Sequence, residues 1–497
     1  MTNVSPQTKI NKIVSLCKRR GYVFQSSEIY GGLKSSYDFG HLGVELKRNI
    51  ADLWWQDLVH RRDDMVGFDA AIIMHPKVWQ ASGHLDGFSD PLVDCLDCKQ
   101  RFRADKAPRH PAGATITYQV KNMEVEGKVA ACGYVCPYCS SPRLGDERQF
   151  NLMFQTNLGA VNPVQDLLNA ISSDDTLTLA TIRQRLRKIN KGSAVYLRPE
   201  TAQAMFVQFM NVLQTTSKKP PFGIAQIGKS FRNEIVTEHF IFRACEFEQM
   251  EIEYFVPPDS WRKWLDYWCE QRLNWYRGFV NQPDNFRLRQ HEEDELAHYA
   301  QACYDIDFKF PWGWDELEGI ASRGDYDLNC HQRLSQTKLS YFDNQAGKRY
   351  LPYVIEPSAG LTRCVLAVLL DAYEESKGID SHGREKTRVL LKLSPRLAPI
   401  KAAFLPLVKD EGQIKLARHL ADSCRQQGVH VAYDDNQSIG KRYAKHDEIG
   451  TPFAITVDTQ SCQDGLVTVR DRDTTTQTRM AGEAAVAKVV SCSSNLR

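Results

Sequence analysis

The sequence lacks a strong excess of charge of either sign and any long apolar run. Its 497 residues carry 63 Lys and Arg against 61 Asp and Glu, a formal net charge of +2. A polyanionic partner would therefore have to be held by local contacts and not by a global field. No stretch approaches the roughly 18 apolar residues needed to span a membrane, and the opening MTNVSPQTKINKIVSL has no apolar core followed by a cleavage site. We expect a cytoplasmic protein without a membrane partner.

The composition is that of a globular protein. Hydrophobic residues make up 42% and charged residues 25% of the chain. A chain of this length is too long for one ordinary hydrophobic core, so we expect one large domain and at least one smaller one. The 14 cysteines are a modest number for this length, which argues against a disulfide scaffold and predicts mostly reduced thiols.

Four cysteines differ from the others by their spacing. Cys95 and Cys98 form one CxxC pair, and Cys136 and Cys139 form another. Two such turns can close a tetrahedral site, which predicts structural Zn²⁺ in a polar segment that has little core of its own. The alternative is a metal-free insertion with two coincidental turns, because the loop between the pairs is longer than is usual in zinc ribbons. Cys132 lies close enough in sequence to replace one ligand.

Local patterns predict the following elements. Helices are expected at 8–20, 44–61 and 261–279, and two helices at 163–191, while a strand should end at Pro76, which cannot donate to a ladder. Alternation from 222 to 255 predicts a long antiparallel hairpin. Because side chains alternate along a strand, Arg232 and Glu234 should share one face of the first strand. On the second strand, one face should carry Phe247, Gln249, Glu251 and Glu253. Such charges form internal ion pairs or meet a charged ligand, and composition alone slightly favours ion pairs.

A second charged position opens an apolar helix. Residues 350–376 read as an apolar strand, a tight turn at 357–360 and a helix with Arg363 in its first turn. Such a junction directs backbone N–H groups and a guanidinium at one point, which favours phosphate binding. After a Pro-containing linker, strands and helices alternate, with helices at 412–427, 440–450 and 482–490. This pattern predicts a small α/β domain with a mostly parallel sheet.

Several motifs occur in one order along nearly the whole chain: HPKVWQASGH (75–84), FNLMF (150–154), YLRPETAQ (196–203), FRNE (231–234), FEQMEIE (247–253), DYDL (325–328) and VIEPSAG (354–360). In this set the sequence resembles the homodimeric class II glycyl-tRNA synthetases. The resemblance implies an α/β (α+β) fold class. It implies a catalytic domain at 1–394 on a six-stranded antiparallel sheet, with a zinc-ribbon-like insertion at 95–145 and a helical excursion at 160–195, and an anticodon-binding α/β domain at 395–497.

The resemblance also implies an enzyme that activates glycine with ATP and Mg²⁺, passes it to tRNA-Gly and forms a homodimer. Arg232 would bridge the α-phosphate and the glycine carboxylate, and Arg363 would hold the γ-phosphate. The residues implied at the nucleotide are Arg232, Asn233, Glu234, Phe242, Arg243, Ala244, Cys245, Glu246, Phe247, Glu316, Leu317, Arg323, Gly360, Leu361, Thr362 and Arg363. Those implied at glycine are Arg103, Glu200, Phe247, Glu248, Gln249, Met250, Glu251, Glu356, Pro357, Ser358, Ala359 and Gly360.

Some positions depart from that family. Cys245 replaces the usual arginine, Ala204 replaces a glycine, and the loop at 236–239 reads VTEH. By the resemblance, these changes affect the positions that contact the acceptor end of tRNA more than those that bind ATP. Two other functions stay open: a nucleic-acid-binding accessory subunit that keeps the fold, and activation of glycine for a carrier or another tRNA-like acceptor. Retention of the arginines and glutamates favours the enzyme.

Overall fold

A seven-stranded sheet forms the centre of the large domain in the computed structural model, which describes residues 6–120, 123–159, 163–173, 178–192, 194–235, 239–297, 300–379 and 385–494. The strand order is β14-β15-β16-β19-β13-β12-β3. These strands are β3 (Met65–Gly67), β12 (Phe222–Phe231), β13 (Glu246–Val256), β14 (Phe286–Gln290), β15 (Ala302–Phe310), β16 (Gly313–Gly324) and β19 (Tyr353–Gly360). Six strands are antiparallel, as predicted, and β3 adds a short parallel edge beside β12.

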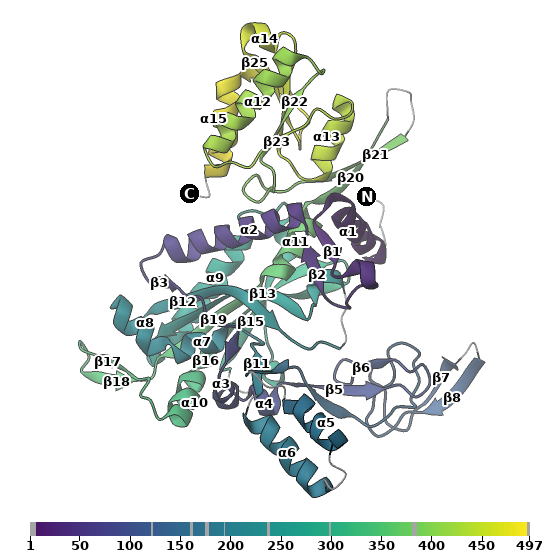
Figure 1. Ribbon diagram of the computed structural model, residues 1–497, viewed down its shortest axis with the longest axis vertical. Coiled ribbons are helices and arrows are strands. Elements are labelled where there is room, and N and C mark those ends of the chain that lie inside the picture. Colours follow the sequence, from purple (N-terminus) through teal and green to yellow (C-terminus); the bar gives the residue numbers. More distant parts are fainter. Residues whose placement is uncertain are drawn as a thin grey trace.

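One face of this sheet is apolar and packs on helices (Figure 1). Helices α9 (Trp261–Arg277) and α11 (Leu361–Ala372) contact the sheet, and α2 (His41–Trp55) packs on α11. Because side chains alternate along a strand, Met250, Ile252 and Tyr254 of β13 enter this core. The residues between them, including Glu251, point to the opposite face, where the sheet is polar.

Shorter elements surround the sheet. They are α1 (Pro6–Arg20), β1 (Val23–Gln25), β2 (Tyr37–Phe39), the π-helix η2 (Gln56–His60), β4 (Ile73–Met74), α3 (Pro76–Ala81), α4 (His84–Gly87), β10 (Gln155–Asn157), β11 (Ala194–Leu197), α7 (Ala202–Val207), α8 (Phe209–Thr216), α10 (Tyr326–Ser335), β17 (Tyr341–Asp343), β18 (Lys348–Tyr350), β20 (Tyr373–Ile379) and β21 (Glu385–Leu391). Short 3₁₀ turns are η1 (Glu28–Tyr30), η3 (Phe240–Phe242), η4 (Pro258–Ser260), η5 (Pro283–Asn285) and η6 (Glu293–Glu295). As predicted, a strand ends before Pro76, which begins α3.

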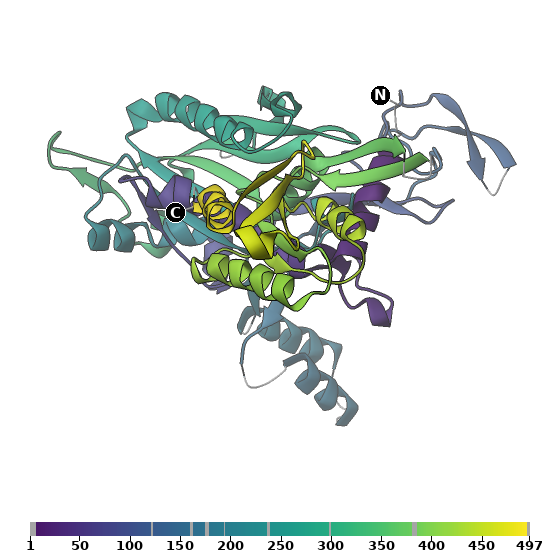
Figure 2. The ribbon, with the colours of Figure 1, turned by 90° about the horizontal axis from the view of Figure 1, so that it is seen from above.

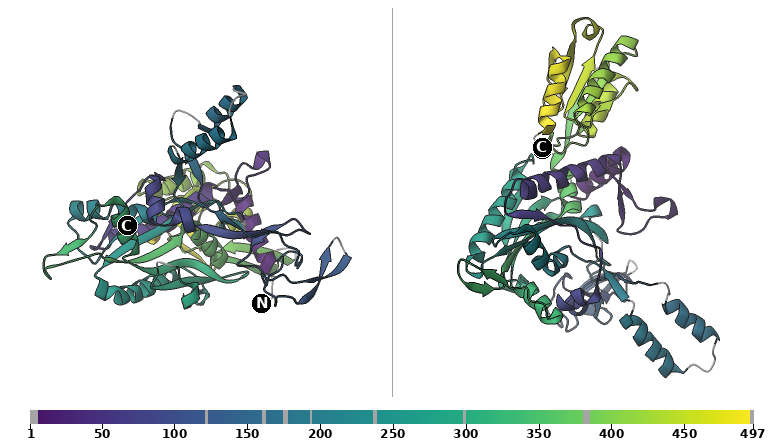
Figure 3. Two further views of the ribbon diagram at one scale, coloured as in Figure 1. Left: turned by 90° about the horizontal axis from the view of Figure 1, so that it is seen from below. Right: turned by 60° about the vertical axis from the view of Figure 1, so that its left-hand side comes forward.

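Two insertions leave the large domain. The cysteine-rich segment forms β5 (Ser89–Asp94), β6 (Arg101–Arg103), the hairpin of β7 (Thr115–Val120) and β8 (Met123–Lys128), and β9 (Arg148–Asn151). Helices α5 (Pro163–Ser173) and α6 (Leu179–Gly192) form a separate projection, which stands away from the sheet in Figure 3. The two helices agree with the prediction for 163–191.

The C-terminal part is a five-stranded sheet with helices, packed over the large domain (Figures 1 and 2). Its elements are β22 (Ala402–Pro406), α12 (Glu411–Gln426), β23 (Ala432–Tyr433), α13 (Ile439–Glu448), β24 (Phe453–Val457), α14 (Ser461–Asp464), β25 (Leu466–Asp471), β26 (Gln477–Ala481) and α15 (Gly482–Ser494). As predicted, β22 pairs in parallel with β23 and β24, but the sheet is mixed, because β25 is antiparallel to both β24 and β26.

Two further predictions need correction. The first hairpin strand ends at Phe231, so Arg232 and Glu234 lie just beyond the strand and not on its face. Residues 357–360 continue β19 and do not form a turn, and α11 begins directly after Gly360. Among the described residues, no helix is long and apolar enough to cross a membrane.

Candidate active site

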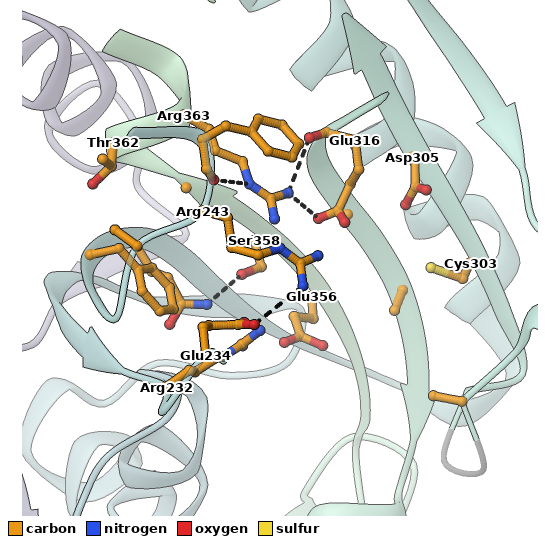
Figure 4. A pocket seen from close by; sticks show the side chains of 18 of the residues that line it. Arg232, Glu234, Arg243, Cys303, Asp305, Glu316, Glu356, Ser358, Thr362 and Arg363 are labelled. Atoms are coloured by element: carbon orange, nitrogen blue, oxygen red, sulfur yellow. Dashed lines mark hydrogen bonds and ion pairs between the residues drawn. The ribbon is translucent and has the colours of Figure 1, made fainter. Parts of the chain in front are cut away.

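The polar face of the large sheet is hollowed into a cavity of about 290 Å³ (Figure 4). Its walls come from the connecting loop of the β12–β13 hairpin, from β13, β15, β16 and β19, and from the first turn of α11. The residues that line it and that the sequence predicted are Arg232, Glu234, Phe242, Arg243, Ala244, Phe247, Gln249, Glu316, Glu356, Ser358, Gly360, Thr362 and Arg363. Segments far apart in the sequence therefore converge on one cavity.

Arg363 lies at one end of the cavity, where α11 begins. Its Nε donates to the Phe242 carbonyl at 3.2 Å, its Nη1 donates to the Glu316 carbonyl at 3.1 Å, and the guanidinium lies 4.4 Å from the centre of the Phe242 ring. The Glu316 carboxylate is 3.3 Å from Nη1, and this guanidinium holds the pKa of Glu316 below its usual range. The arginine is thus oriented by three groups before any ligand binds.

Arg232 and Arg243 form a second cationic group at the end of the hairpin. Arg232 Nε donates to the Pro199 carbonyl at 3.0 Å, and its guanidinium lies 5.3 Å from the centre of the Phe247 ring. Arg243 Nη1 is 3.2 Å from a carboxylate oxygen of Glu234. Figure 4 shows Arg243 and Arg363 on the same side of the cavity, with the carboxylate of Glu356 across from them. Two anionic groups could be accommodated between these cations.

Glu356 lines the other end of the cavity, and the buried carboxylates of Glu251 and Glu200 lie near it without lining the cavity. Glu251 accepts hydrogen bonds from the backbone N–H of Thr201 at 3.0 Å and from the Ser358 hydroxyl at 2.6 Å, and the Thr201 hydroxyl also donates to it. Glu356 accepts from Arg323 Nη1 at 2.8 Å. Glu200 lies 3.4 Å from His84 Nε2 and accepts from Gln203 at 2.9 Å. This end is built to hold a small cation.

These carboxylates titrate abnormally. Burial raises the pKa of Glu356 to about 8, although Arg323 opposes the shift. Burial and the charge of Glu200 raise the pKa of Glu251. Burial also opposes ionisation of Glu200, but His84 and Arg323 hold its pKa below the usual range. Perturbed carboxylates in a cavity are typical of functional sites.

The wall formed by β14 and β15 contains residues that the sequence interpretation missed. His291, Cys303 and Asp305 line the cavity, and His291 Nε2 lies 2.8 Å from Asp305. Arg289 also donates to Asp305 at 2.7 Å. No spacing rule connects these residues, because β14 and β15 bring them together only by pairing. His84 belongs to the motif at 75–84, so its partnership with Glu200 had a sequence signal but no assigned role.

Other predicted residues lie outside the cavity lining. Glu248 pairs with Lys47 and Glu246 pairs with Lys229, each directed away from the cavity. Arg103 is held by Asp90 at 2.8 Å. Arg323 is predicted at the nucleotide, but it is buried behind Glu356 and paired with Asp327 at 2.7 Å. Asn233, Cys245, Met250, Leu317, Pro357, Ala359 and Leu361 belong to the lining strands and turns without lining the cavity.

The four cysteines converge in the insertion. Sγ of Cys95 lies 3.6 Å from Sγ of Cys139, and Sγ of Cys98 lies 3.6 Å from Sγ of Cys136. All four sulfur atoms lie within 4.8 Å of one another. Cys132 is not part of this group, because its thiol faces the Tyr134 carbonyl at 3.9 Å. The β7–β8 hairpin occupies the long segment between the two CxxC turns.

Comparison with known proteins identifies the family. Residues 186–373 match the class II tRNA synthetase core domain (G, H, P, S and T), and residues 401–491 match the anticodon binding domain. A glycine–tRNA ligase of Treponema denticola is 44% identical over 97% of this chain and 96% of its own length. One of Mycolicibacterium vanbaalenii is 47% identical over 95% of each chain. The chain belongs to the glycine–tRNA ligase family.

Membership of the glycine–tRNA ligase family makes the protein an aminoacyl-tRNA ligase and confirms the predicted fold class. A solved structure has the same fold: prolyl-tRNA synthetase from Cryptosporidium parvum in complex with L-proline and AMP. Its TM-score is 0.58 at 12% identity, covering 99% of this chain and 81% of that one. Within the glycine–tRNA ligase family, the cavity on the polar sheet face is the candidate catalytic centre.

Proposed function

We propose that the protein joins glycine to ATP to form glycyl-adenylate and then transfers glycine to the 3′-terminal adenosine of tRNA-Gly, in protein synthesis. The observation that carries this proposal is the cavity that brings Arg232, Arg243 and Arg363 together with the buried carboxylate of Glu356, near which Glu200 and Glu251 lie. A nucleic-acid-binding accessory subunit would have no use for this arrangement, since its binding needs neither oriented arginines nor buried acids.

In the first step the glycine carboxylate attacks the α-phosphate of ATP. The nucleophile is already ionised, so the work of the protein is to align and neutralise two anions. Arg232 would bridge the carboxylate and the α-phosphate, because it lines the cavity at the loop end of the hairpin, beside Phe247. Arg363 would hold the γ-phosphate, and Glu234, Phe242, Arg243 and Phe247 would hold the rest of the nucleotide.

Mg²⁺ would accompany ATP, because class II synthetases use both. Mg²⁺ is usually bound through one or two carboxylates together with substrate phosphates. Glu316 fits this role, since its carboxylate is ionised beside Arg363 at the proposed phosphate end. The ion would neutralise phosphate charge, and Glu316 would then exchange its contact with Arg363 for one with the metal.

Selection of glycine would depend on the carboxylate end. Glu200, Glu251 and Glu356 would surround the ammonium group, and Ser358 would limit the volume beside it. All competing amino acids are larger than glycine, so steric exclusion suffices and no second site for editing smaller products is needed. Glu356→Gln should weaken glycine binding more than ATP binding.

The remaining partners are proposed from the family. The C-terminal part matches an anticodon binding domain, so it would contact tRNA-Gly. A cytoplasmic homodimer is proposed as well. Ile29 and Tyr30 favour an interface, because each is 87% exposed and large apolar side chains at such exposure commonly lie where a second protein binds. Sedimentation velocity of the full chain tests the oligomeric state.

Structural Zn²⁺ is proposed at the four cysteines. Zn–S bonds of about 2.3 Å in a tetrahedron put the sulfur atoms about 3.8 Å apart. The distances of 3.6 Å in two of the pairs fit this geometry. Cys95, Cys98, Cys136 and Cys139 would hold the ion, which would supply folding energy to the insertion.

The first test is ATP–pyrophosphate exchange with glycine, alanine, serine, threonine and proline in parallel, followed by charging of bulk tRNA. We expect exchange with glycine alone and glycine incorporation into tRNA. Exchange with none of the amino acids, in folded protein that contains zinc, would move the conclusion to the accessory subunit. Exchange without tRNA charging would favour a different acceptor.

A further inference from the structure

Behind the proposed glycine site lies a carboxylate that nothing so far explains. Glu253 is fully buried, at 0% exposure, and neither of its carboxylate oxygens has a hydrogen-bond partner among the described residues. An ionised carboxylate in such a position would cost several kcal/mol, so the group takes up a proton or finds a cation.

The sheet register places Glu253 beside Glu356. The β13–β19 pairing joins Glu251 to Ser358 and Tyr254 to Ile355, which puts Glu253 level with Glu356 on the same polar face. Oxygens of Glu251, Glu253 and Glu356 all lie within 4.8 Å of one another. Like charges directly opposite on neighbouring strands repel, and here both are removed from water.

Charged neighbours do not balance this group. Arg323 of β16 is the cation of the cluster, and it already donates to Glu356 and to both oxygens of Asp327 in α10. Glu251 precedes Glu253 on the polar face of β13, and Glu200 adds its charge to Glu356. The opposite neighbour on β12 is Ile224, and Phe255 follows on the same face, so the surroundings on that side are apolar.

A proton in this pair resides on the partner that has fewer donors. Glu356 has the Arg323 guanidinium at 2.8 Å, which stabilises its anion. Glu253 has no hydrogen-bond donor among the described residues, so its neutral form has a lower free energy than its ionised form. A neutral carboxylic acid must donate its O–H, and the nearby acceptors are carboxylates.

We propose that Glu253 is a neutral carboxylic acid and a positioning residue, which donates its proton in a hydrogen bond to Glu356 and so keeps Glu356 ionised toward the glycine ammonium. Glu253 itself does not touch the substrate. The proposal rests on the proposed glycine site, because Glu356 matters only if it receives the ammonium group.

The titration of the pair agrees with this assignment. Burial, and then the charge of Glu356, raise the pKa of Glu253 well above its usual range. Burial raises the pKa of Glu356 to about 8 where Glu253 donates no hydrogen bond to it, so Glu356 needs a further donor to be ionised at neutral pH. Protonated Glu356 cannot accept a hydrogen bond from an ammonium group through that oxygen, so glycine affinity should fall as the pH drops below this pKa. A donor at position 253 lowers the pKa of Glu356 and extends the useful pH range downward.

The kinetic test measures the pH profile of the glycine KM in ATP–pyrophosphate exchange for the full-length protein, Glu253→Gln and Glu253→Leu. The Gln amide donates without charge and should keep the wild-type midpoint. Leu cannot donate, so its midpoint should rise by about one pH unit and its glycine KM by about tenfold below the midpoint, with the ATP KM unchanged. If both variants shift the midpoint downward, Glu253 is an anion; if neither shifts it, Glu253 only fills space.

Infrared spectroscopy tests the proton without substrate. The carbonyl stretch of protonated carboxylic acids at neutral pH should contain one band in the wild type that Glu253→Gln lacks in the difference spectrum, whereas exposed Glu270→Gln should leave this band unchanged. Absence of this band from the wild type would overturn the proposal even if Glu253→Leu fails to fold. Failure of glycine to support exchange would overturn the proposed function and leave the infrared result standing.

Discussion

At the scale of single residues, the site depends on side chains that are oriented before ligands bind. Arg363 is one of them, because two backbone carbonyls and a carboxylate hold its guanidinium in place.

Arg363→Ala should reduce adenylate formation by at least two orders of magnitude, because it removes the proposed γ-phosphate contact in a cavity where charge is poorly screened. Its partners, the Phe242 and Glu316 carbonyls, lie at the surface of the cavity, so the fold should persist. Glycine-dependent ATP–pyrophosphate exchange measures adenylate formation, and the thermal unfolding midpoint measures the stability of the fold. Exposed Arg262→Ala is the control, and near-normal exchange by Arg363→Ala would remove Arg363 from the ATP site.

The sequence predicted these residues unequally. Arg232, Glu251 and Arg363 stand in local motifs, so resemblance was enough to propose them. The role of Arg323 could not be read in the same way. The resemblance of its segment to the family suggested the nucleotide, but its burial between Asp327 and Glu356 follows from the pairing of β16 with β19 and from the docking of α10. Contacts across strands distant in sequence leave no local pattern.

At the scale of elements, the cysteine insertion should depend on its metal. Structural Zn²⁺ contributes on the order of 10 kcal/mol to folding of such small units, and the insertion has only a small apolar cluster of its own. We expect metal analysis to give about one Zn²⁺ per chain. Cys136→Ser should lose the ion and become sensitive to proteolysis within 95–145. Cys132→Ser should keep zinc, because Cys132 lies outside the sulfur cluster. Full zinc content in Cys136→Ser would contradict the site.

Elements were predicted well where periodicity is local. The β12–β13 hairpin and the helix α9 occur where the alternation and the tryptophan-rich pattern indicated. The C-terminal sheet has one strand, β25, that departs from the predicted parallel arrangement. The connection between β24 and β25 contains only the short α14, and a parallel crossover needs a dozen or more residues, so β25 must run antiparallel. Strand direction thus depended on one connection length.

At the scale of the whole molecule, a buried charge cluster joins the two domains. Asp447 of α13 accepts from Arg470 at 2.8 Å within the C-terminal domain and from Arg388 of β21 at 2.9 Å. Arg388 also donates to the Arg472 carbonyl at 2.8 Å. The long β20–β21 hairpin therefore reaches from the catalytic domain into the anticodon-binding part. No residue of this cluster lines the cavity, so domain docking and glycine activation should be separable.

Asp447→Asn should show that separation. It leaves the buried guanidinium of Arg470 and the partly exposed guanidinium of Arg388 without their counter-charge. Breaking a buried pair costs about 3–5 kcal/mol, and the solvent exposure of Arg388 reduces its part of this cost. We expect a lower unfolding midpoint for the C-terminal domain. We also expect a raised KM for tRNA, because tRNA must contact the C-terminal domain and the cavity at the same time, and the variant no longer holds the two domains in a fixed arrangement. Glycine-dependent exchange without tRNA should stay unchanged, since it needs only the sheet face and α11. Asp422→Asn, at an exposed pair with Arg425 on α12, is the matched control. Equal losses in exchange and in tRNA charging would mean that the cluster supports the catalytic cavity itself, so that the two domains act as one folding unit.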